Sequence, residues 1–470
     1  MVNKEKFLRK LYEILATLRY NSERTEVIEE ILKNFLISPD IDLDIKKEAT
    51  IIFNKKKKGF ESKNNKNFDI EIKKELFKQK CILLSNTPHE FIPEYIYEKF
   101  SPFNKYFEKQ YHFDMNSLWI FAFKLMEYLE FKKYSLNFWD EMYKFKSKEE
   151  YADMSFISIP SEEYIKNWKN IITFSVSEIK KIIPLCKHDI DRVIDTICIN
   201  INTLKDKKEF DLHLKPLLRI DDILILLAPH YITRSLPSLY ELLFKKITEY
   251  NENKGKSFEK LAQKTIKQLP FKLLAYNVEY RNGETDAVLK FINSAWFVEI
   301  TSHPPSEKAL RGDWNAISSD LTKTIKKCIK QGERCLNNID KEPLKTFSKN
   351  VKIKGTIVVL DGVYPQLNVN TAFTFHKEKF PIYIINWFDL RLLISQPEIN
   401  LFEEFLLWRT TNKPMPVICF DEKDYWAFYF DNYRKNKRMR KAFKTMQRKQ
   451  IRNFYISYRF NNKEYLKNLV

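Results

Sequence analysis

Two strand-like apolar runs, each carrying a carboxylate, restrict most strongly what this chain can fold into. They lie within residues 282–303, with Asp286 near the start of the first run and Glu299 inside the second. The dipeptide Asn282-Gly283 is a strong hairpin signal, because a two-residue type I′ turn needs a positive φ at both central positions. The sequence therefore predicts antiparallel strands at about residues 275–281 and 284–292, and a third strand at about 295–302.

Asp286 and Glu299 are candidate ligands of one cation. Side chains alternate between the two faces of a strand, so Glu299, Thr301 and His303 share a face. If the strands are neighbours in a suitable register, Asp286 converges with Glu299. A hard divalent cation prefers oxygen ligands of this kind, from one or two carboxylates, a backbone carbonyl and several waters. The pattern therefore predicts a Mg²⁺ (or Mn²⁺) site across these two strands.

A helix with a further carboxylate is predicted before the first strand, over residues 257–269. Ser257 is its predicted N-cap, and Glu259 lies in its first turn, where the helix dipole favours a negative charge. The resulting order is a helix with Glu, a strand, a strand with Asp and a strand with Glu. This order resembles the PD-(D/E)XK, or restriction-endonuclease-like, nuclease superfamily. The resemblance covers about residues 254–420.

The resemblance implies a metal-dependent hydrolase that cleaves phosphodiester bonds. It makes Glu259, Asp286 and Glu299 catalytic residues. Asp286, Glu299 and the carbonyl of Ile300 would be the ligands of Mg²⁺ or Mn²⁺, which lowers the pKa of a coordinated water and stabilises the pentacovalent phosphate. The layout is also similar to uncharacterised bacterial nuclease-like proteins associated with restriction or phage defence.

One position departs from the family pattern. The family expects a lysine two residues after the second carboxylate, in contact with the attacking water and the scissile phosphate, and this chain has Thr301 there. Another residue must take the place of that lysine, or the site is weak or inactive. The candidates are Lys308, Lys323 and Lys327.

The predicted crossover helix, residues 318–336, bears on that choice. On a helical wheel Lys323 and Lys327 lie nearly opposite the packed face, which favours a solvated position over a catalytic one. Gln331 lies on the flank of the same helix, and some members of the family place a Gln at the active site from this helix. Thr301 and Gln331 therefore complete the set of candidate catalytic residues.

The distribution of glycine and of helical periodicity indicates several domains. Six of the seven glycines fall between positions 255 and 362, so turns with positive φ are concentrated there and the rest of the chain is predicted to be mainly helical. A length of 470 residues is a soft prior for about three domains. We predict a multidomain α plus α/β protein. Its parts are a helical N-terminal domain (1–165), a winged-helix-like or connecting module (166–250), a restriction-endonuclease-like mixed β-sheet flanked by helices (251–420) and a basic C-terminal tail (421–470).

The winged-helix-like assignment rests on helix-turn-helix spacing in residues 174–199, where Ser175 and Glu178 form a capping box. A small hairpin is predicted at residues 217–227. The second helix carries three aspartates, which nucleic-acid phosphates would repel. A structural role is therefore favoured over DNA reading. The polar segment after Tyr250 is the predicted boundary with the nuclease-like domain.

The charge balance indicates a polyanionic partner. A net charge of +19 favours nucleic acid, with DNA preferred over RNA, although a lysine-rich proteome from an AT-rich genome would give the same balance. Residues 432–463 hold twelve Lys or Arg with interspersed aromatics and no Asp or Glu. This pattern suits phosphate contacts and base stacking, and it equally suits an amphipathic helix packed on the body. The candidate nucleic-acid-binding residues are Arg434, Lys435, Lys437, Arg438, Arg440 and Lys441.

The cysteine and hydropathy patterns predict a cytoplasmic protein. The six cysteines form no CxxC pair and no zinc-type spacing with histidine, as expected of reduced thiols. The longest apolar run, about residues 223–229, is far too short to span a bilayer, and residues 1–10 hold no apolar signal segment. Neither a membrane anchor nor secretion is expected. A protein partner or a homo-oligomer is compatible with the sequence.

The leading prediction is a Mg²⁺-dependent endonuclease, and the resemblance alone implies a role in anti-phage defence. A rival is a catalytically inactive nuclease fold that binds nucleic acid or scaffolds a defence complex, and Thr301 is its main support. A second rival is a toxin-like RNase that works through a His/Arg pair in the helical half, which predicts cleavage that persists in EDTA.

Overall fold

A computed structural model describes much of the chain, and its contacts divide into two compact units. Each unit is described by itself. Unit 1 comprises residues 1–69, 107–236 and 450–470, and unit 2 comprises residues 70–106 and 237–449. The described residues are 4–20, 25–61, 89–135, 159–200, 215–229, 231–280, 283–303, 306, 308, 314–348, 352–362, 381–411 and 422–434.

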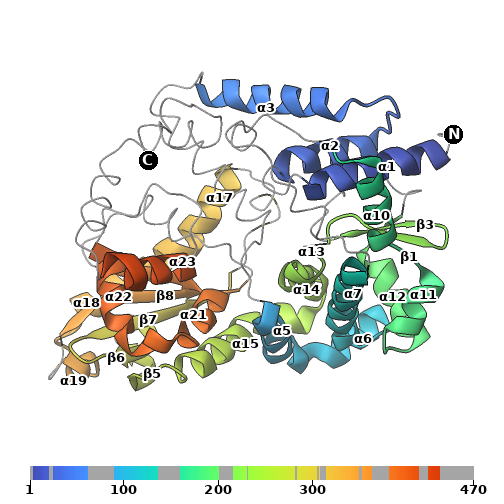
Figure 1. The fold of residues 1–470 in the computed structure, drawn as a ribbon. Helices are drawn as coiled ribbons and strands as arrows, with labels where there is room; N and C mark the ends of the chain where they lie inside the picture. Colours follow the sequence, from blue (N-terminus) through green and yellow to red (C-terminus); the bar gives the residue numbers. More distant parts are fainter. Residues whose placement is uncertain are drawn as a thin grey trace. The chain divides into compact units, whose positions relative to one another are not determined.

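Amphipathic helices form much of unit 1 (Figure 1). Apolar residues at helical spacing, such as Leu11, Leu15, Ile28 and Ile31, are buried along one face. The mainly helical character predicted for this region is confirmed. The helices are α1 (Lys4–Tyr20), α2 (Thr25–Ile37), α3 (Ile45–Glu61), α7 (Met115–Ser135), α10 (Glu162–Ile172), α11 (Val176–Ile182), α12 (Lys187–Ile197) and α13 (Tyr231–Arg234), while α6 (Asn104–Tyr111) begins in unit 2.

A small mixed sheet completes unit 1, in the order β1-β4-β3-β2. The capping box predicted at Ser175 and Glu178 is present at the start of α11. The predicted hairpin is formed by β3 and β4, which pair antiparallel. The strands are β1 (Thr173–Ser175), β2 (Cys198–Asn200), β3 (Leu217–Ile220) and β4 (Ile223–Leu226).

The three aspartates of α12 make bonds inside unit 1. Each carboxylate has a partner on another element, which supports the structural role predicted for this helix. Asp189 accepts from the Ser117 hydroxyl at 2.8 Å, Asp191 pairs with Lys180 at 2.6 Å, and Asp195 pairs with Arg219 at 3.3 Å.

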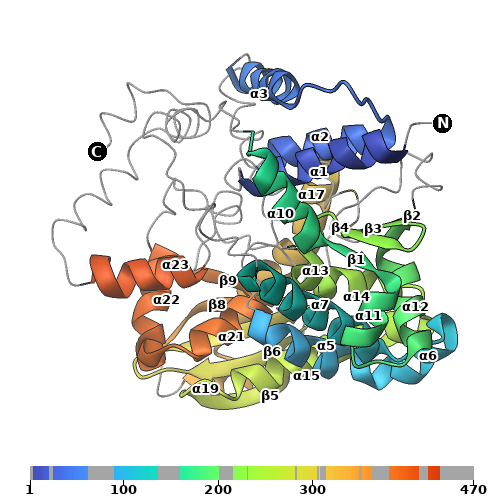
Figure 2. The same ribbon diagram turned by 45° about the vertical axis from the view of Figure 1, so that its right-hand side comes forward.

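Unit 2 is built on a five-stranded mixed sheet flanked by helices (Figures 1 and 2). The order is β5-β6-β7-β8-β9, with antiparallel pairing up to β7 and parallel pairing from β7 onward. The three strands predicted around Asp286 and Glu299 are confirmed as β5, β6 and β7, and β8 lies inside the sheet. The five strands are β5 (Lys272–Tyr280), β6 (Gly283–Lys290), β7 (Ala295–Thr301), β8 (Ile353–Leu360) and β9 (Ile382–Asn386).

The hairpin between β5 and β6 turns one residue earlier than predicted. Gly283 already pairs with Tyr280, so residues 281 and 282 link the strands, and both lie outside the described residues. Gly283 is needed for space: a Cβ there would lie 2.8 Å from the Tyr280 hydroxyl oxygen.

Helix α15 (Thr248–Ile266) begins earlier than predicted. Ser257 is not its N-cap, because it lies within the helix and its hydroxyl donates to the Lys99 carbonyl at 2.5 Å. The segment predicted as a polar linker forms the first turns of α15. Tyr250, only 1% exposed, stacks on the Phe100 ring, and this burial holds those turns to the core of unit 2.

The connection from β7 to β8 is a helix with a π-helical segment in its middle. Helix α17 (Trp314–Leu321), the π segment η5 (Thr322–Lys326) and α18 (Lys327–Asn337) follow one another without a break. Helix α18 packs on β6, β7 and β8. Gly332 allows the close approach, since a Cβ there would lie 2.3 Å from the Thr356 hydroxyl oxygen. The predicted crossover helix is confirmed.

Further helices complete unit 2, several of them on the face of the sheet away from α18. The Trp387 indole N–H donates to the Thr265 hydroxyl at 2.8 Å, which joins the first turn of α21 to α15. The remaining helices are η2 (His89–Phe91), α5 (Ile92–Phe100), η3 (Ser101–Phe103), α14 (Leu236–Phe244), α19 (Leu344–Ser348), α21 (Trp387–Ile394), η6 (Pro397–Leu401), α22 (Phe402–Thr411), α23 (Glu422–Ala427) and η7 (Phe428–Tyr433).

A buried ion pair ties α5 to the end of β8. The Lys99 ammonium bonds Asp361 at 2.6 Å and also Glu241, and Lys99 and Asp361 are both fully buried. The Tyr95 hydroxyl donates to the other oxygen of Asp361. Burial opposes the charged form of Lys99, but the two carboxylates outweigh it, so the pKa of Lys99 is raised.

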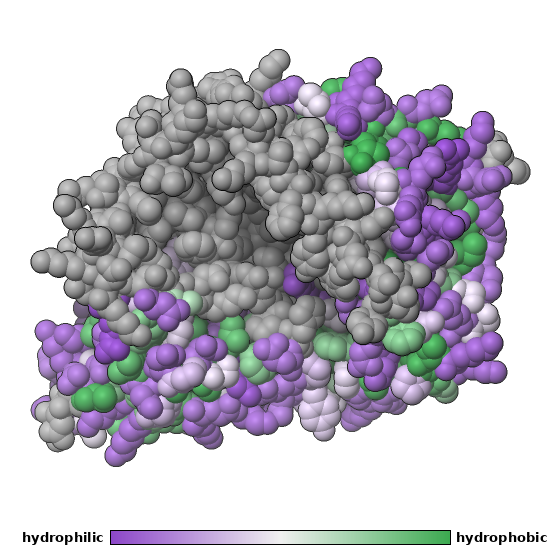
Figure 3. Space-filling view, viewed as in Figure 1, coloured by the Kyte–Doolittle hydropathy of each residue, from purple (hydrophilic) through white to green (hydrophobic). Residues whose placement is uncertain are grey.

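The described surface is mainly polar on the face that Figure 3 shows, where hydrophobic residues are scattered among hydrophilic ones. In the described part of the chain, no helix has the length and apolarity that crossing a bilayer requires.

Replacing Lys99 with Met should destabilise the protein by about 3–5 kcal/mol, because Asp361 and Glu241 would keep buried charges without their cation. Urea unfolding at neutral pH measures the change. Lys260→Met, at an exposed position of α15, is the control and should change little. Equal stability of the two variants would show that the ion pair contributes nothing.

Two glycine substitutions should act in opposite directions. Gly332→Ala should cost about 1–3 kcal/mol, because the added methyl meets the buried, β-branched Thr356. Gly255→Ala should gain about 0.5–1 kcal/mol, since this exposed helical position has its nearest contact at an ordinary 3.6 Å. Thermal unfolding of both variants measures the pair, and a stable Gly332→Ala would contradict the packing of α18 on β8.

Candidate functional site

The register of β6 on β7 places Asp286 across from Glu299. Ala287 pairs with Val298, so the next positions along the two strands are Asp286 and Glu299. Residues directly opposite in an antiparallel pair project from the same face, with Cβ atoms about 5 Å apart. Glu299 is 1% exposed and Asp286 is half-buried. The charge of Asp286 also acts on Glu299, so the two carboxylates lie near each other.

Asp286 is held in place by the backbone of the neighbouring strand. One carboxylate oxygen accepts the Ile300 N–H at 2.5 Å. Burial raises the pKa of Asp286 to about 6, against the lowering effect of that hydrogen bond, and the charges of Glu259 and Glu284 raise it further. The carboxyl group is thus partly protonated near neutrality unless a cation offsets the cost of its charge.

Glu299 has the more unusual environment. Its Oε1 is buried without a hydrogen-bond partner among the described residues. Burial is the main cause that raises the pKa of Glu299 well above its ordinary value, and the neighbouring charge of Asp286 adds to it. A buried polar atom without a partner is costly, so this oxygen is a candidate for a ligand.

The carbonyl of Ile300 can supply a third oxygen. The N–H and C=O of one strand residue point to the same neighbouring strand, and the Ile300 N–H points to Asp286 on β6. Its carbonyl lies beyond the last β6–β7 pair, Ala287 with Val298. Two carboxylates and one carbonyl are the kind of donor set that Mg²⁺ accepts together with waters.

This set is smaller than a complete protein cage. Among the described side chains, no group of three or more His, Cys, Asp or Glu is placed to hold a metal ion. A Mg²⁺ ion commonly keeps several waters and takes only one or two carboxylates, so the residues present fit a magnesium ion better than a zinc ion.

Glu259 reaches the neighbourhood of Asp286 from α15. It is half-buried, and its charge contributes to the raised pKa of Asp286. The Gln263 amide donates both to Glu259 at 2.9 Å and to the side-chain oxygen of Asn277 at 3.2 Å. Asn277 has a left-handed φ of 48° at the β5 position opposite Asp286. Through Gln263, Glu259 is thus connected to Asn277 on the edge strand β5, next to Asp286.

Thr301 ends β7 and supplies no positive charge. It is half-buried, and its carbonyl accepts the Asp361 N–H at 3.1 Å. Asp361 does not join the site, because Glu299 pairs with Val358 and Asp361, three positions further on, projects to the opposite face. The replacement for the motif lysine must come from another element.

Three lysines were candidates for that replacement. Lys308 and Lys323 are exposed, and the charge of Lys323 acts on His303, whose pKa is lowered chiefly by burial. Lys327 is also exposed, as predicted, but its charge lowers the pKa of both Asp286 and Glu299.

The structure brings one further residue to the site that the sequence reasoning did not include. This residue is Glu284, whose charge acts on both Asp286 and Glu299. The alternation Glu284-Thr285-Asp286 could have revealed it, since residues two apart share a strand face. Gln331, which was a candidate, is half-buried one helical turn beyond Lys327.

The proposed nucleic-acid contacts lie mostly outside the described residues. Arg434 is described: its guanidinium pairs with Glu404 at 3.0 Å and lies 5.9 Å from the centroid of the Phe430 ring. Lys435, Lys437, Arg438, Arg440 and Lys441 lie outside the described residues.

Comparisons with protein-family models, with curated proteins and with solved structures find no match to this chain.

Neutralising either carboxylate should stabilise the metal-free protein at pH 8. The folded-state pKa of Asp286 is raised from 3.8 to about 6, so the folded state binds more protons within that window and stability falls as pH rises through it. Asp286→Asn and Glu299→Gln remove the ionisation. Asp286→Asn should gain on the order of 1–3 kcal/mol at pH 8 and less at pH 5, and Glu299→Gln should change stability in the same direction.

Urea unfolding in EDTA at the two pH values measures this gain. Glu252→Gln, at an exposed position of α15, is the control and should show no such difference. A loss of stability at pH 8 in both site variants would mean that the charged carboxylates have favourable partners in the folded protein.

Proposed function

We propose that unit 2 carries a metal-dependent nuclease site that hydrolyses phosphodiester bonds, with DNA as the preferred substrate over RNA. The observation that carries this proposal is the buried Glu299 oxygen without a partner, placed across from a second carboxylate, Asp286. Such a pair stores an electrostatic cost that a divalent cation would relieve. The element order around it is the one in which the sequence resembles the PD-(D/E)XK superfamily.

Asp286, Glu299 and the Ile300 carbonyl would hold a Mg²⁺ or Mn²⁺ ion. When bound, the ion supplies Lewis-acid chemistry, polarising the phosphate and lowering the pKa of a coordinated water. The hydrogen bond from the Ile300 N–H fixes one oxygen of Asp286 and leaves the other available. Glu259, aligned by Gln263, orients the same region from α15 or assists in holding the ion.

The substrate class follows from charge. The chain carries a net charge of +19, and a polyanion is the partner that such a balance attracts over long range. The basic tail, including Arg434 and the lysines after it, would add contacts to phosphates and bases. A role in anti-phage defence, with a protein partner or a homo-oligomer, rests on the resemblance and on no residue of this chain.

An inactive nuclease fold that binds nucleic acid is the second candidate. Thr301 favours it, because a threonine cannot supply the positive charge that the family has at that position. The two candidates differ in metal binding. A working site should raise the melting temperature as Mn²⁺ is added, by ligand linkage, and a site that no longer binds metal should not.

Cleavage by the purified full chain tests the proposal. Plasmid, linear duplex DNA, single-stranded DNA and RNA are incubated with Mg²⁺ or Mn²⁺. The wild type should cut at least one substrate, and EDTA should stop the reaction. Asp286→Asn and Glu299→Gln should each lower the rate by about 10³-fold or more, because each removes a charged metal ligand.

Glu252→Gln is the matched control and should cleave at the wild-type rate. Cleavage that persists in EDTA would contradict a metal-dependent site. Binding of nucleic acid without cleavage in either metal, together with no thermal shift, would favour the inactive fold.

A further inference from the structure

The geometry points to Lys327 as the residue that takes the place of the missing motif lysine, contacting the scissile phosphate beside Asp286 and Glu299. This inference rests on the proposed function and names a catalytic residue for it. The sequence analysis named Lys327 as one of three candidates, although the helical wheel favoured a solvated position over a catalytic one.

The level of Lys327 along the sheet follows from the contact at Gly332. Gly332 abuts Thr356, and Thr356 pairs with Phe297 on β7. Lys327 precedes Gly332 by five residues, about 7.5 Å along the helix axis. Glu299 follows Phe297 by two residues, about 6.6 Å along the strand. If the helix runs opposite to β7, Lys327 is level with Glu299.

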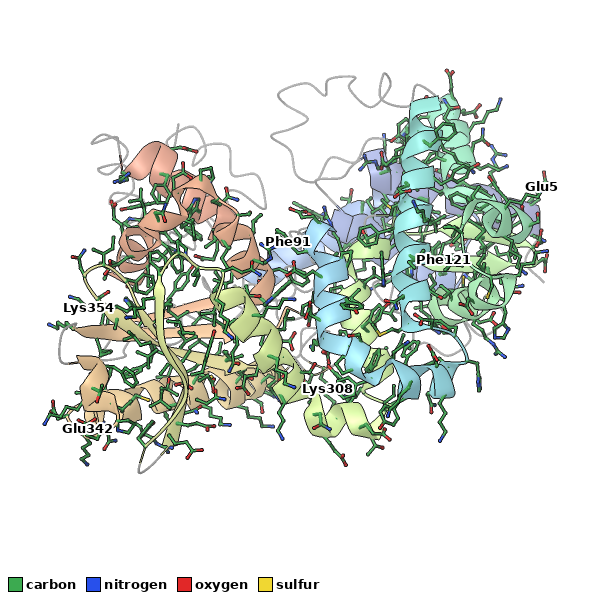
Figure 4. All side chains as sticks on the ribbon, turned by 90° about the horizontal axis from the view of Figure 1, so that it is seen from below. Glu5, Phe91, Phe121, Lys308, Glu342 and Lys354 are labelled. Carbon is green, nitrogen blue, oxygen red and sulfur yellow. The ribbon has the colours of Figure 1, made fainter. Side chains whose placement is uncertain are left out.

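Helix α18 does run opposite to β7. The strands β7 and β8 are parallel, so the helix that connects them must run back along the sheet. Figure 4 agrees: Glu342, shortly after the end of α18, and Lys354, near the start of β8, lie toward the same end of unit 2. Lys327 is therefore at the opposite end, where β7 finishes.

A π-helical segment, η5 (Thr322–Lys326), lies directly before Lys327. Within α18 the buried positions next to Lys327 are Cys328 and Gly332, which face the sheet. Extra turns of this kind are frequent at functional sites.

The residue next to Lys327 faces the strands that carry the carboxylates. Cys328 is buried, and α18 packs on β6 and β7. The charges of Glu299 and Asp286 add to the effect of burial in raising the pKa of the Cys328 thiol. The positive charge of Lys327 acts on the same two carboxyl groups in the opposite sense.

The described ion pairs do not include one between Lys327 and the two carboxylates. Among the described ion pairs, none joins its ammonium to Asp286 or Glu299 within 4.0 Å. An exposed ammonium that is not bonded to the carboxylates can contact an anion. In the reaction, the oxygen of water bonds to phosphorus as the bond to the leaving oxygen breaks, the attacking water loses a proton to solvent and the leaving oxygen takes one up. A nearby cation stabilises the negative charge that accumulates on the phosphoryl oxygens.

Single-turnover cleavage of a labelled linear duplex in Mg²⁺ tests this role. Lys327→Met should lower the rate by about 10²–10³-fold, the loss typical of removing one group that stabilises transition-state charge. Lys327→Arg should recover part of it. Lys330→Met, at an exposed position one turn along α18, is the matched control and should keep the wild-type rate.

A measurement of metal binding distinguishes a catalytic role of Lys327 from a structural role. The Mn²⁺-induced rise in melting temperature should be kept or increased in Lys327→Met, because removing a nearby positive charge favours a cation. Loss of that rise together with cleavage would mean that Lys327 only maintains the carboxylate pair, and would overturn the inference.

The outcomes also distinguish the inference from the proposed function. Wild-type cleavage that is lost in Asp286→Asn but kept in Lys327→Met overturns the role of Lys327 alone. If the wild type does not cleave, binding of the duplex in Ca²⁺ decides: unchanged affinity in Lys327→Met, or no binding by the wild type, overturns the phosphate contact as well.

Discussion

The arrangement of unit 2 depends on the pairing of Ala287 with Val298. This pair is the last of the β6–β7 ladder before Asp286 and Glu299, which lie next to it on the two strands, and a shift by one residue would change which side chains meet there. The pairing also ends at this point, which frees the Ile300 N–H to hold Asp286 and leaves the Ile300 carbonyl without a strand partner on that side. The oxygen atoms of Asp286, Glu299 and the Ile300 carbonyl thus lie where the β6–β7 pairing ends.

The two faces of the sheet differ in how their buried charges are neutralised. On one face α18 packs closely through Gly332 and carries Lys327 and Gln331 past the carboxylates. On the other face Lys99 and Asp361 form a fully buried ion pair that holds α5 to β8. The charges on that second face are neutralised within the core, whereas Glu299 keeps an oxygen without a partner. This contrast is why we assign chemistry to the first face only.

The errors in the sequence predictions have identifiable physical causes. Ser257 looked like an N-cap, but Tyr250 is drawn into an aromatic cluster and the helix starts before it. The hairpin turn was placed one residue late, because Gly283 serves the space around Tyr280 and not a turn dihedral.

The sequence by itself determined the local elements and the two main carboxylates. Alternating apolar residues specify the strands, helical spacing specifies the crossover helix, and a carboxylate within a buried strand is costly enough to mark Asp286 and Glu299 without any coordinates. Only the tertiary structure decided what surrounds them: which backbone N–H holds Asp286, which oxygen of Glu299 lacks a partner and which lysine lies level with the pair. Those features depend on strand register and on the phase of a packed helix, and contacts between distant segments set both.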